Sequence, residues 1–463
     1  MRLTAAIVSA KAAAALSRGL RRGGGTALPG LVAERIDPHL VSTLAGRLGQ
    51  GSVLVTGTNG KTTTAGLVRN ICAEAGLRPV ANREGSNMMR GVAAALAESA
   101  QWDGRFRARK RRIGVFEVEE ATMPLVARAV EPRAVLFTNL FRDQLDRYGE
   151  VATVATLWRK AVRAFPADVA LVINGDDPAV ASLSDAAVGR VVLYGVDDAS
   201  QAGGPLEHAA DARWCYVCGA ELEYSAVFYG HLGHWRCPGC SRSRPAPDVA
   251  VTSVTSQEGG MIVKITAPGG EVIARLPLSG LYNAYNASAA VALAVALGLE
   301  REAIERGLAG FTAAFGRQES LSVDGREVQV VLAKNPAGVN QVIRTITADG
   351  APKHLAVFLN DDLADGRDIS WIWDVDFELL AGRTASLVVS GRRAWDMALR
   401  LKYAGLGDRP DVEHDSSLAL RRAIARTPPG ETLYVIPTYT AMLETRNILG
   451  RWAGRGEFWR DGT

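Results

Sequence analysis

The sequence predicts an α/β protein with a central parallel sheet and a second, C-terminal α/β domain. Three observations lead to this fold class. Short β-branched runs alternate with helical stretches, a glycine-rich loop joins one of these runs to a helix, and the alternation restarts near residue 328. The 463 residues exceed one ordinary core, and 48% hydrophobic with 22% charged residues is the composition of a folded protein. The net charge of +4 is too small to argue for nucleic acid by itself, and no basic cluster with interleaved aromatic residues is strong enough to support such a partner.

Residues 1–45 are expected to form an N-terminal helical extension. Residues 1–30 are rich in Ala and Arg, but Lys11 breaks their apolar run, so an amphipathic helix is favoured over an export signal. The longest apolar run, 287–299, is shorter than the roughly 20 residues that span a membrane. We therefore expect a buried helix there, no transmembrane segment, and a cytoplasmic protein.

Residues 46–316 are predicted as the first α/β domain. Its strands are expected at 53–56, 113–118, 134–138, 169–173, 191–194 and 261–266, with a long helix at 283–299. At about 205–248 the composition changes to Gly, Cys, His, Pro and aromatic residues, which indicates an inserted module. Residues 317–320 are expected as a linker. The C-terminal domain is predicted over 317–463, with strands at 328–332, 355–359, 387–390 and 433–436.

A phosphate-binding loop is predicted after the first strand. Gly57 and Gly60 let the backbone approach phosphate oxygens, Lys61 can reach the β- and γ-phosphates, and Thr62 can offer its hydroxyl to Mg²⁺. The common pattern has a further glycine at the position of Val55, so the alternative is an ordinary glycine-rich turn. The loop residues expected to bind ATP are Gly57, Thr58, Asn59, Gly60, Lys61, Thr62 and Thr63.

Three acids close the strand predicted at 113–118: Glu117, Glu119 and Glu120. Ligands of open α/β sheets bind beyond the carboxyl ends of the strands, and side chains two residues apart share a face. We therefore expect a carboxylate here, assigned to Glu117, to hold Mg²⁺ together with Thr62. The alternative is a solvated helix start.

Four of the five cysteines form two Cys-x-x-Cys pairs within the inserted module. Cys215 and Cys218 are separated by 18 residues from Cys237 and Cys240, a spacing that suits a structural zinc ribbon better than a redox pair. Four thiolates leave no open position, so the zinc is not expected to be catalytic. The nearby His208, His231 and His234 are expected to be packed or solvated rather than ligands, and Cys72 to lie in the core.

Several motifs in the same order resemble the Mur ligase family. They are Gly-Thr-Asn-Gly-Lys-Thr at 57–62, Asp-Gln-Leu-Asp-Arg-Tyr-Gly at 143–149, Asn-Gly-Asp-Asp-Pro at 174–178, Gly-Leu-Tyr-Asn-Ala-Tyr-Asn-Ala at 280–287 and Gly-Arg-Gln-Glu at 316–319. The resemblance implies a Mur ligase central ATPase domain that joins a carboxylate to an amine through an acyl phosphate. It also implies that Lys61 is catalytic, that Asn283 and Asn286 contact the adenine, and that Arg317 meets the phosphates.

The sequence departs from the family in two places. Gln144 replaces the usual His, and Lys160 stands two residues too far for the carbamylated lysine of many members, which leaves the second Mg²⁺ without an assigned ligand. Leu-Ala-Lys-Asn-Pro-Ala-Gly at 332–338 stands where the amino-acid-adding members have Asp-Tyr-Ala-His-Asn-Pro. The amine is therefore expected to be supplied differently.

A Mur ligase core with an inserted zinc ribbon, a changed C-terminal domain and the segment 360–374 resembles the MurT family. This resemblance implies the ligase subunit of a lipid II isoglutaminyl synthase in peptidoglycan biosynthesis, which works on lipid II at the inner membrane face. It implies a heterodimer in which a GatD-type glutaminase docks on the C-terminal domain and Asp368 completes the partner's Cys and His. Four other Asp lie within seven residues of Asp368, so a turn-capping role is the alternative.

Two other functions compete with this one. The first is a single-subunit Mur-type amino-acid ligase of the folylpolyglutamate synthase kind, which should carry the intact Asp-x-Ala-His-Asn-Pro motif. The second is a non-enzymatic nucleic-acid-binding protein that uses the zinc ribbon.

Overall fold

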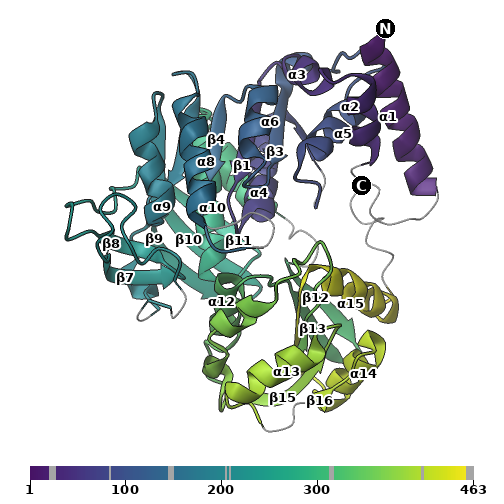
Figure 1. The fold of residues 1–463 in the computed structure, drawn as a ribbon, viewed down its shortest axis with the longest axis vertical. Helices are drawn as coiled ribbons and strands as arrows, with labels where there is room; N and C mark the ends of the chain where they lie inside the picture. The colour runs from purple at the N-terminus through teal and green to yellow at the C-terminus, as the bar shows by residue number, and fades with distance from the viewer. Residues whose placement is uncertain are drawn as a thin grey trace.

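The computed structural model describes residues 1–19, 28–82, 85–143, 151–203, 206–207, 210–311, 317–407 and 411–454, without the side chains of 18–19 and 317–319. Across these ranges the strands form a nine-stranded sheet, a six-stranded sheet and a two-stranded hairpin. Figure 1 shows the two larger sheets as separate layered bodies, with the C-terminal one below the first.

The nine-stranded sheet has the order β11-β10-β9-β6-β5-β4-β1-β3-β2. Neighbours from β2 to β9 are parallel, and β9, β10 and β11 are antiparallel. Its strands are β1 (Ser52–Thr56), β2 (Arg78–Ala81), β3 (Arg112–Glu117), β4 (Ala134–Phe137), β5 (Ala170–Asn174), β6 (Val191–Val196), β9 (Val249–Gln257), β10 (Gly260–Ala267) and β11 (Gly270–Leu276). The predicted parallel sheet is therefore confirmed, with an antiparallel edge added.

Helices cover both faces of this sheet because its buried strands are apolar on both sides. Val53 and Val55 face one core, which contains α4 (Lys61–Glu74), α10 (Leu281–Ala296) and α11 (Arg301–Ala309). Leu54 faces the other core. That core contains α3 (Leu40–Ala45), α5 (Met89–Ser99), α6 (Met123–Val130) and α8 (Val151–Arg163). Cys72 lies in the first core, as predicted, and burial raises the pKa of its thiol to about 12.

The N-terminal segment is helical, as predicted. It consists of α1 (Arg2–Gly19) and α2 (Leu28–Ile36), which pack on each other and on α5. The predicted amphipathic pattern of α1 is wrong, because Ile7 lies in the core while Val8 and Leu16 on the opposite face are exposed. None of the helices in the described ranges has both the length and the hydropathy of a membrane-spanning segment.

The C-terminal sheet has the order β12-β13-β17-β14-β15-β16. Its strands are β12 (Arg317–Val323), β13 (Arg326–Val331), β14 (Lys353–Phe358), β15 (Thr384–Ser390), β16 (Asp411–Val412) and β17 (Thr432–Pro437). One core contains α12 (Pro336–Ile346) and α13 (Ala394–Tyr403), and the other contains α14 (Ser416–Arg426) and α15 (Tyr439–Trp452). The linker predicted at 317–320 is wrong: these residues begin β12, which pairs with β13.

The inserted module carries the hairpin of β7 (Glu223–Tyr229) and β8 (Leu232–Arg236) between β6 and β9. Short helical turns complete the chain: η1 (Arg109–Arg111), α9 (Pro178–Ala181), η2 (Ser182–Ala186), η3 (Ala199–Gln201), η4 (Ser370–Asp374) and η5 (Phe377–Leu380).

Candidate active site and thiolate cluster

The loop between β1 and α4 requires glycine at two positions. Gly57 has φ 133° and Gly60 has φ 84°, backbone conformations that other residues rarely adopt. A Cβ at Gly60 would lie 2.1 Å from Asn286 Oδ1, and one at Gly57 would lie 2.0 Å from Thr138 Oγ1. The loop can therefore expose its N–H groups at the start of α4, where a helix attracts phosphate.

Lys61 and Thr62 begin α4 beside the acids that end β3. Lys61 Nζ is buried, donates to the carbonyls of Gly57 and Thr58, and lies 3.2 Å from Glu120 Oε2. Thr62 Oγ1 donates to Glu117 Oε2 over 2.8 Å. A hydroxyl and a carboxylate this close are the oxygen ligands that Mg²⁺ prefers, so these residues fit the ion assigned to them. Sequence reasoning missed the Lys61–Glu120 pair.

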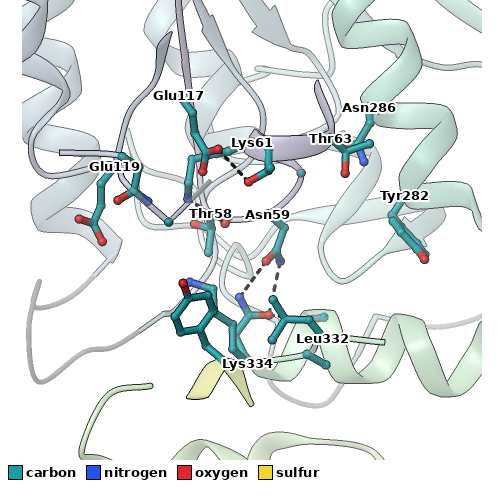
Figure 2. Close-up of a pocket in the computed structure, with 18 of the residues that line it drawn as sticks. Thr58, Asn59, Lys61, Thr63, Glu117, Glu119, Tyr282, Asn286, Leu332 and Lys334 are labelled. Carbon is teal, nitrogen blue, oxygen red and sulfur yellow. Dashed lines mark hydrogen bonds between the residues drawn. The ribbon is translucent and has the colours of Figure 1, made fainter. Parts of the chain in front are cut away.

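A cavity of about 380 Å³ opens beside this loop and is lined from both larger sheets. Figure 2 shows Thr58, Asn59, Lys61, Glu117 and Glu119 above it, Tyr282 and Asn286 of α10 to one side, and Leu332 and Lys334 below. The predicted face shared by Glu117 and Glu119 is confirmed, since both line this cavity. Thr63 lines it as well.

The amides of α10 are fixed where the adenine is expected. Asn286 Nδ2 donates to Asn283 Oδ1 over 3.0 Å, and Thr64 Oγ1 donates to Asn286 Oδ1 over 3.3 Å. The structure thus brings Asn283 and Asn286 together with the phosphate loop on one cavity. The side chain of Arg317, Gly316 and the segment 144–149 lie outside the described residues, so their assignments stay predictions.

The segment 332–338 of the C-terminal domain contacts the phosphate loop and its surroundings. Asn335 Nδ2 donates to Asn59 Oδ1 over 3.0 Å, and Lys334 forms an ion pair with Asp143. Burial favours the neutral amine of Lys334, but Asp143 and Glu120 outweigh this effect and raise its pKa, so the ammonium stays charged. The site therefore contains a second cation, which sequence reasoning did not assign.

The four cysteines of the inserted module form one cluster. Cys215 Sγ lies 3.6 Å from Cys240 Sγ, Cys218 Sγ lies 3.3 Å from Cys237 Sγ, and all four sulfur atoms lie within 4.8 Å of one another. Tetrahedral zinc with Zn–S bonds of about 2.3 Å needs sulfur atoms about 3.8 Å apart. The donor set and its size therefore fit zinc.

The neighbouring histidines are not part of this cluster. His231 is fully buried, with Nε2 3.2 Å from Asp177 Oδ2, and its ring packs 4.5 Å from that of Phe141. His234 Nε2 lies 2.8 Å from the carbonyl of Val196. Both are packed, as expected, and His208 lies outside the described residues.

The tip of the β7–β8 hairpin lies beneath the phosphate loop. Asn59 Nδ2 donates to the hydroxyl of Tyr229 over 2.8 Å. Phe141 packs between Tyr229 and His231, with its ring centroid 5.1 Å from that of Tyr229, and Phe141 N donates to Thr58 Oγ1 over 3.0 Å. The inserted module thus supports the loop that is expected to hold the phosphates, a contact that sequence reasoning missed.

A buried carboxylate fixes the module to α10. Asp176 Oδ2 accepts from Tyr285 Oη over 2.6 Å, and Asp176 Oδ1 pairs with Arg244 at the end of the module. Burial raises the pKa of Asp176, and Arg244 opposes that shift.

Asp368 stands apart from the other acids of its segment. Asp361 and Asp362 pair with Arg393 and Arg392, Asp365 accepts from Thr440, and Asp374 pairs with Arg142. Asp368 is exposed and accepts from Ser370 N over 2.8 Å. The hydrogen bonds from Ser370 lower the pKa of Asp368, so it presents an ionised carboxylate to solvent. The site itself stays a prediction.

Comparisons with known proteins place these features in a family. Residues 55–294 match the model of the Mur ligase middle domain, and residues 332–442 match that of the MurT ligase C-terminal domain. Two relatives are named as MurT subunits of lipid II isoglutaminyl synthase (glutamine-hydrolyzing). The one from Streptococcus pneumoniae is 33% identical, over 93% of both chains. The one from Staphylococcus aureus is 32% identical, over 97% of this chain and 98% of the relative.

Solved structures share the fold. A pseudomurein peptide ligase type C from Methanothermus fervidus superposes with a TM-score of 0.65 at 22% identity, over 86% of this chain and 78% of that one. A folylpolyglutamate synthase from Mycobacterium tuberculosis gives 0.61 at 19% identity, over 90% and 95%.

Proposed function

The chain belongs to the MurT family within the Mur ligases, and on this premise we propose that it is the ATP-dependent ligase subunit of a glutamine-hydrolysing lipid II isoglutaminyl synthase. The observation that supports this most directly is the cavity that joins the glycine loop, Glu117 and the amides of α10 to the MurT-type C-terminal domain. The glycine loop and the acids supply a site for a nucleotide and a cation, and the second domain closes it.

The proposed reaction has two steps. An oxygen of the D-glutamate α-carboxylate in the lipid II stem peptide attacks the γ-phosphorus of ATP, and ADP leaves. The nitrogen of ammonia then attacks the resulting acyl carbon and phosphate leaves, which gives D-isoglutamine after loss of a proton. Lys61, which lines the cavity, is proposed to neutralise the transferring phosphoryl charge, the main requirement of this chemistry.

Thr62 and Glu117 are the residues that would hold Mg²⁺, which supplies charge neutralisation at the phosphate oxygens. Lys334, opposite Asp143, adds a further cation to the site. We propose that this ammonium assists where the sequence departs from the usual carbamylated lysine.

Ammonia is proposed to come from a GatD-type glutaminase partner. Asp368 is suited to complete a Cys–His pair of that partner, because it is ionised and exposed. A carboxylate of this kind fixes the tautomer of the histidine and stabilises its imidazolium form. The four thiolates are proposed to hold structural zinc, since a site closed by four cysteines has no position for a substrate.

One assay tests the function. Amidation of lipid II is followed with glutamine plus the partner glutaminase, with ammonium chloride alone, and without ATP. The proposal expects product in the first two reactions and none in the third. Addition of glutamate or another amino acid to the substrate, with no amidation, would instead establish the single-subunit amino-acid ligase.

A further inference from the structure

Helix α1 presents an apolar face that none of the other described residues buries. Ala6, Ile7, Ala10 and Ala14 face inward and are buried. The opposite positions are exposed, and we call them the outer face of α1: Met1, Ala5, Val8, Ala12 and Leu16. Val8 is 51% and Leu16 65% exposed. Two opposite faces of α1 are therefore apolar, and a contiguous exposed apolar face commonly marks a site of interaction with a protein or a membrane.

A strongly basic segment lies beside this helix. The loop from Trp102 to Arg111, which we call the basic loop, leads from α5 to β3 and exposes five cations: Arg105, Arg107, Arg109, Lys110 and Arg111. In the described ranges only Arg105 has a carboxylate within ion-pair distance, that of Asp103 at 3.6 Å. Trp102 is 69% exposed in the same loop.

Hydrogen bonds hold the loop and the helix together. Lys11 Nζ of α1 donates to the carbonyl of Ala100 over 2.6 Å, at the start of the loop. Arg47, just after α3, donates to the carbonyl of Asp103 over 3.2 Å. Figure 1 shows α1 along the outer edge of the molecule, with its N-terminus at the same end as α3. The apolar face and the cations therefore belong to one rigid region.

This region also flanks the cavity. Arg90 and Gly91, in the first turns of α5, line the cavity, and the other end of α5 leads into the basic loop. Helices α1 and α2 both pack on α5. Helix α5 thus connects the region of α1 and the basic loop to the cavity.

The exposed cations, Trp102 and the apolar outer face of α1 together fit one kind of partner, an anionic membrane surface. Cations attract the phosphates of an anionic bilayer, exposed Trp side chains prefer the headgroup level, and an apolar helix face enters the boundary of the acyl chains. Nucleic acid would use the cations but not the apolar stripe. An 18-residue helix is about 27 Å long, enough to lie along a membrane surface.

We propose that the outer face of α1 and the basic loop dock this protein on an anionic phospholipid surface, with α1 parallel to the membrane plane. The docking rests on the proposed function, because a lipid-linked substrate is what makes the location useful.

The test uses the full chain with its glutaminase partner and vesicles of phosphatidylglycerol and phosphatidylcholine, or of phosphatidylcholine alone. The wild type should sediment with the anionic vesicles and be released by salt. Val8→Glu/Leu16→Glu and, separately, Lys110→Glu/Arg111→Glu should each lower the bound fraction by on the order of tenfold or more.

Control variants carry the same kinds of change elsewhere. Leu418→Glu alters an exposed apolar residue of α14, and Lys264→Glu/Arg275→Glu reverses two exposed cations of β10 and β11. Both should bind vesicles like the wild type. Lys110 and Arg111 are both exposed, so their substitution should not disturb the fold. This variant still tests the proposal if Val8→Glu/Leu16→Glu fails to fold.

Amidation separates the docking from the function. The docking variants should amidate lipid II in detergent micelles at the wild-type rate and lose rate in anionic vesicles. No vesicle binding by the wild type, or unchanged binding by both docking variants, overturns the proposal. The proposal is also overturned if two copies of this chain associate in the wild type and Val8→Glu/Leu16→Glu separates them. It is equally overturned if the basic loop binds duplex DNA and not vesicles. Absence of amidation in micelles by every protein contradicts the proposed function instead.

Discussion

Tyr229→Phe tests whether the inserted module positions the phosphate loop. The substitution removes only the hydroxyl that accepts from Asn59 Nδ2 over 2.8 Å, and it keeps the ring that packs on Phe141. The longer contact of the same amide with Asn335 Oδ1, 3.4 Å, cannot replace the lost bond.

The expected magnitude follows from one partly buried, neutral hydrogen bond. Such a bond contributes about 0.5–1.5 kcal/mol net. If the loop is loosened by that amount, the dissociation constant of ATP rises roughly 2- to 13-fold, at unchanged metal content. Calorimetric titration with a non-hydrolysable ATP analogue measures it directly.

Tyr224→Phe is the matched control. Its hydroxyl donates to the carbonyl of Ala212 over 2.7 Å, within the inserted module, and no hydrogen bond among the described residues joins it to the phosphate loop. This variant should lower the unfolding temperature and leave ATP affinity as it is. Equal loss of affinity in both variants, or none in Tyr229→Phe, refutes the idea that Tyr229 acts on the loop.

Three further changes probe the other parts of the site. Lys61→Met should lower ATP-dependent amidation at least about 100-fold. It should also lower the unfolding midpoint, because Glu120 is left buried without its cation; adding Glu120→Gln should restore the midpoint but not the rate. Purified protein should carry about one zinc per chain by elemental analysis, and Cys218→Ser should lose both metal and thermal stability; a folded, metal-free wild type with freely reactive thiols excludes the ribbon. Asp368→Asn should reduce glutamine-driven amidation on the order of 100-fold and leave ammonia-driven amidation unchanged, whereas equal loss of both activities rejects the role in the partner's triad.

Strands with apolar residues on both faces could be predicted from the sequence. The predictions at 53–56 and 134–138 match β1 and β4 within one residue. The prediction missed the inner strand β9 and the strands β2 and β11; the last two form the edges of the nine-stranded sheet, where exposed and buried positions mix. The linker predicted over 317–320 missed strand β12, although the Asp324-Gly325 turn that pairs it with β13 is a local hairpin signal, with both residues at positive φ.

The sequence predicted those residues of the candidate site that belong to one local motif. The Gly-Lys-Thr sequence leads to Lys61 and Thr62, and the end of a neighbouring strand leads to Glu117. The contacts of Asn59 with Tyr229 and Asn335 join residues 170 and 276 positions apart, and no spacing rule connects them. The basic loop was overlooked for another reason: its cations are plain in the sequence, but their meaning depends on the helix beside them.

The inserted module also decides the order in which the first domain can form. It makes up most of the connection between β6 and β9, which lie side by side as parallel strands with Tyr194 opposite Val249. A parallel pair usually closes through a helix, whereas here it closes through a hairpin and its four cysteines. Unless that segment is compact, it does not hold β9 beside β6. The elements β10, β11 and α10 come after β9 in the chain, so their packing depends on it as well. A chain whose module does not fold would therefore leave the edge of β6 exposed to pairing with other chains. We expect such a chain to aggregate rather than to accumulate as a folded enzyme of reduced activity.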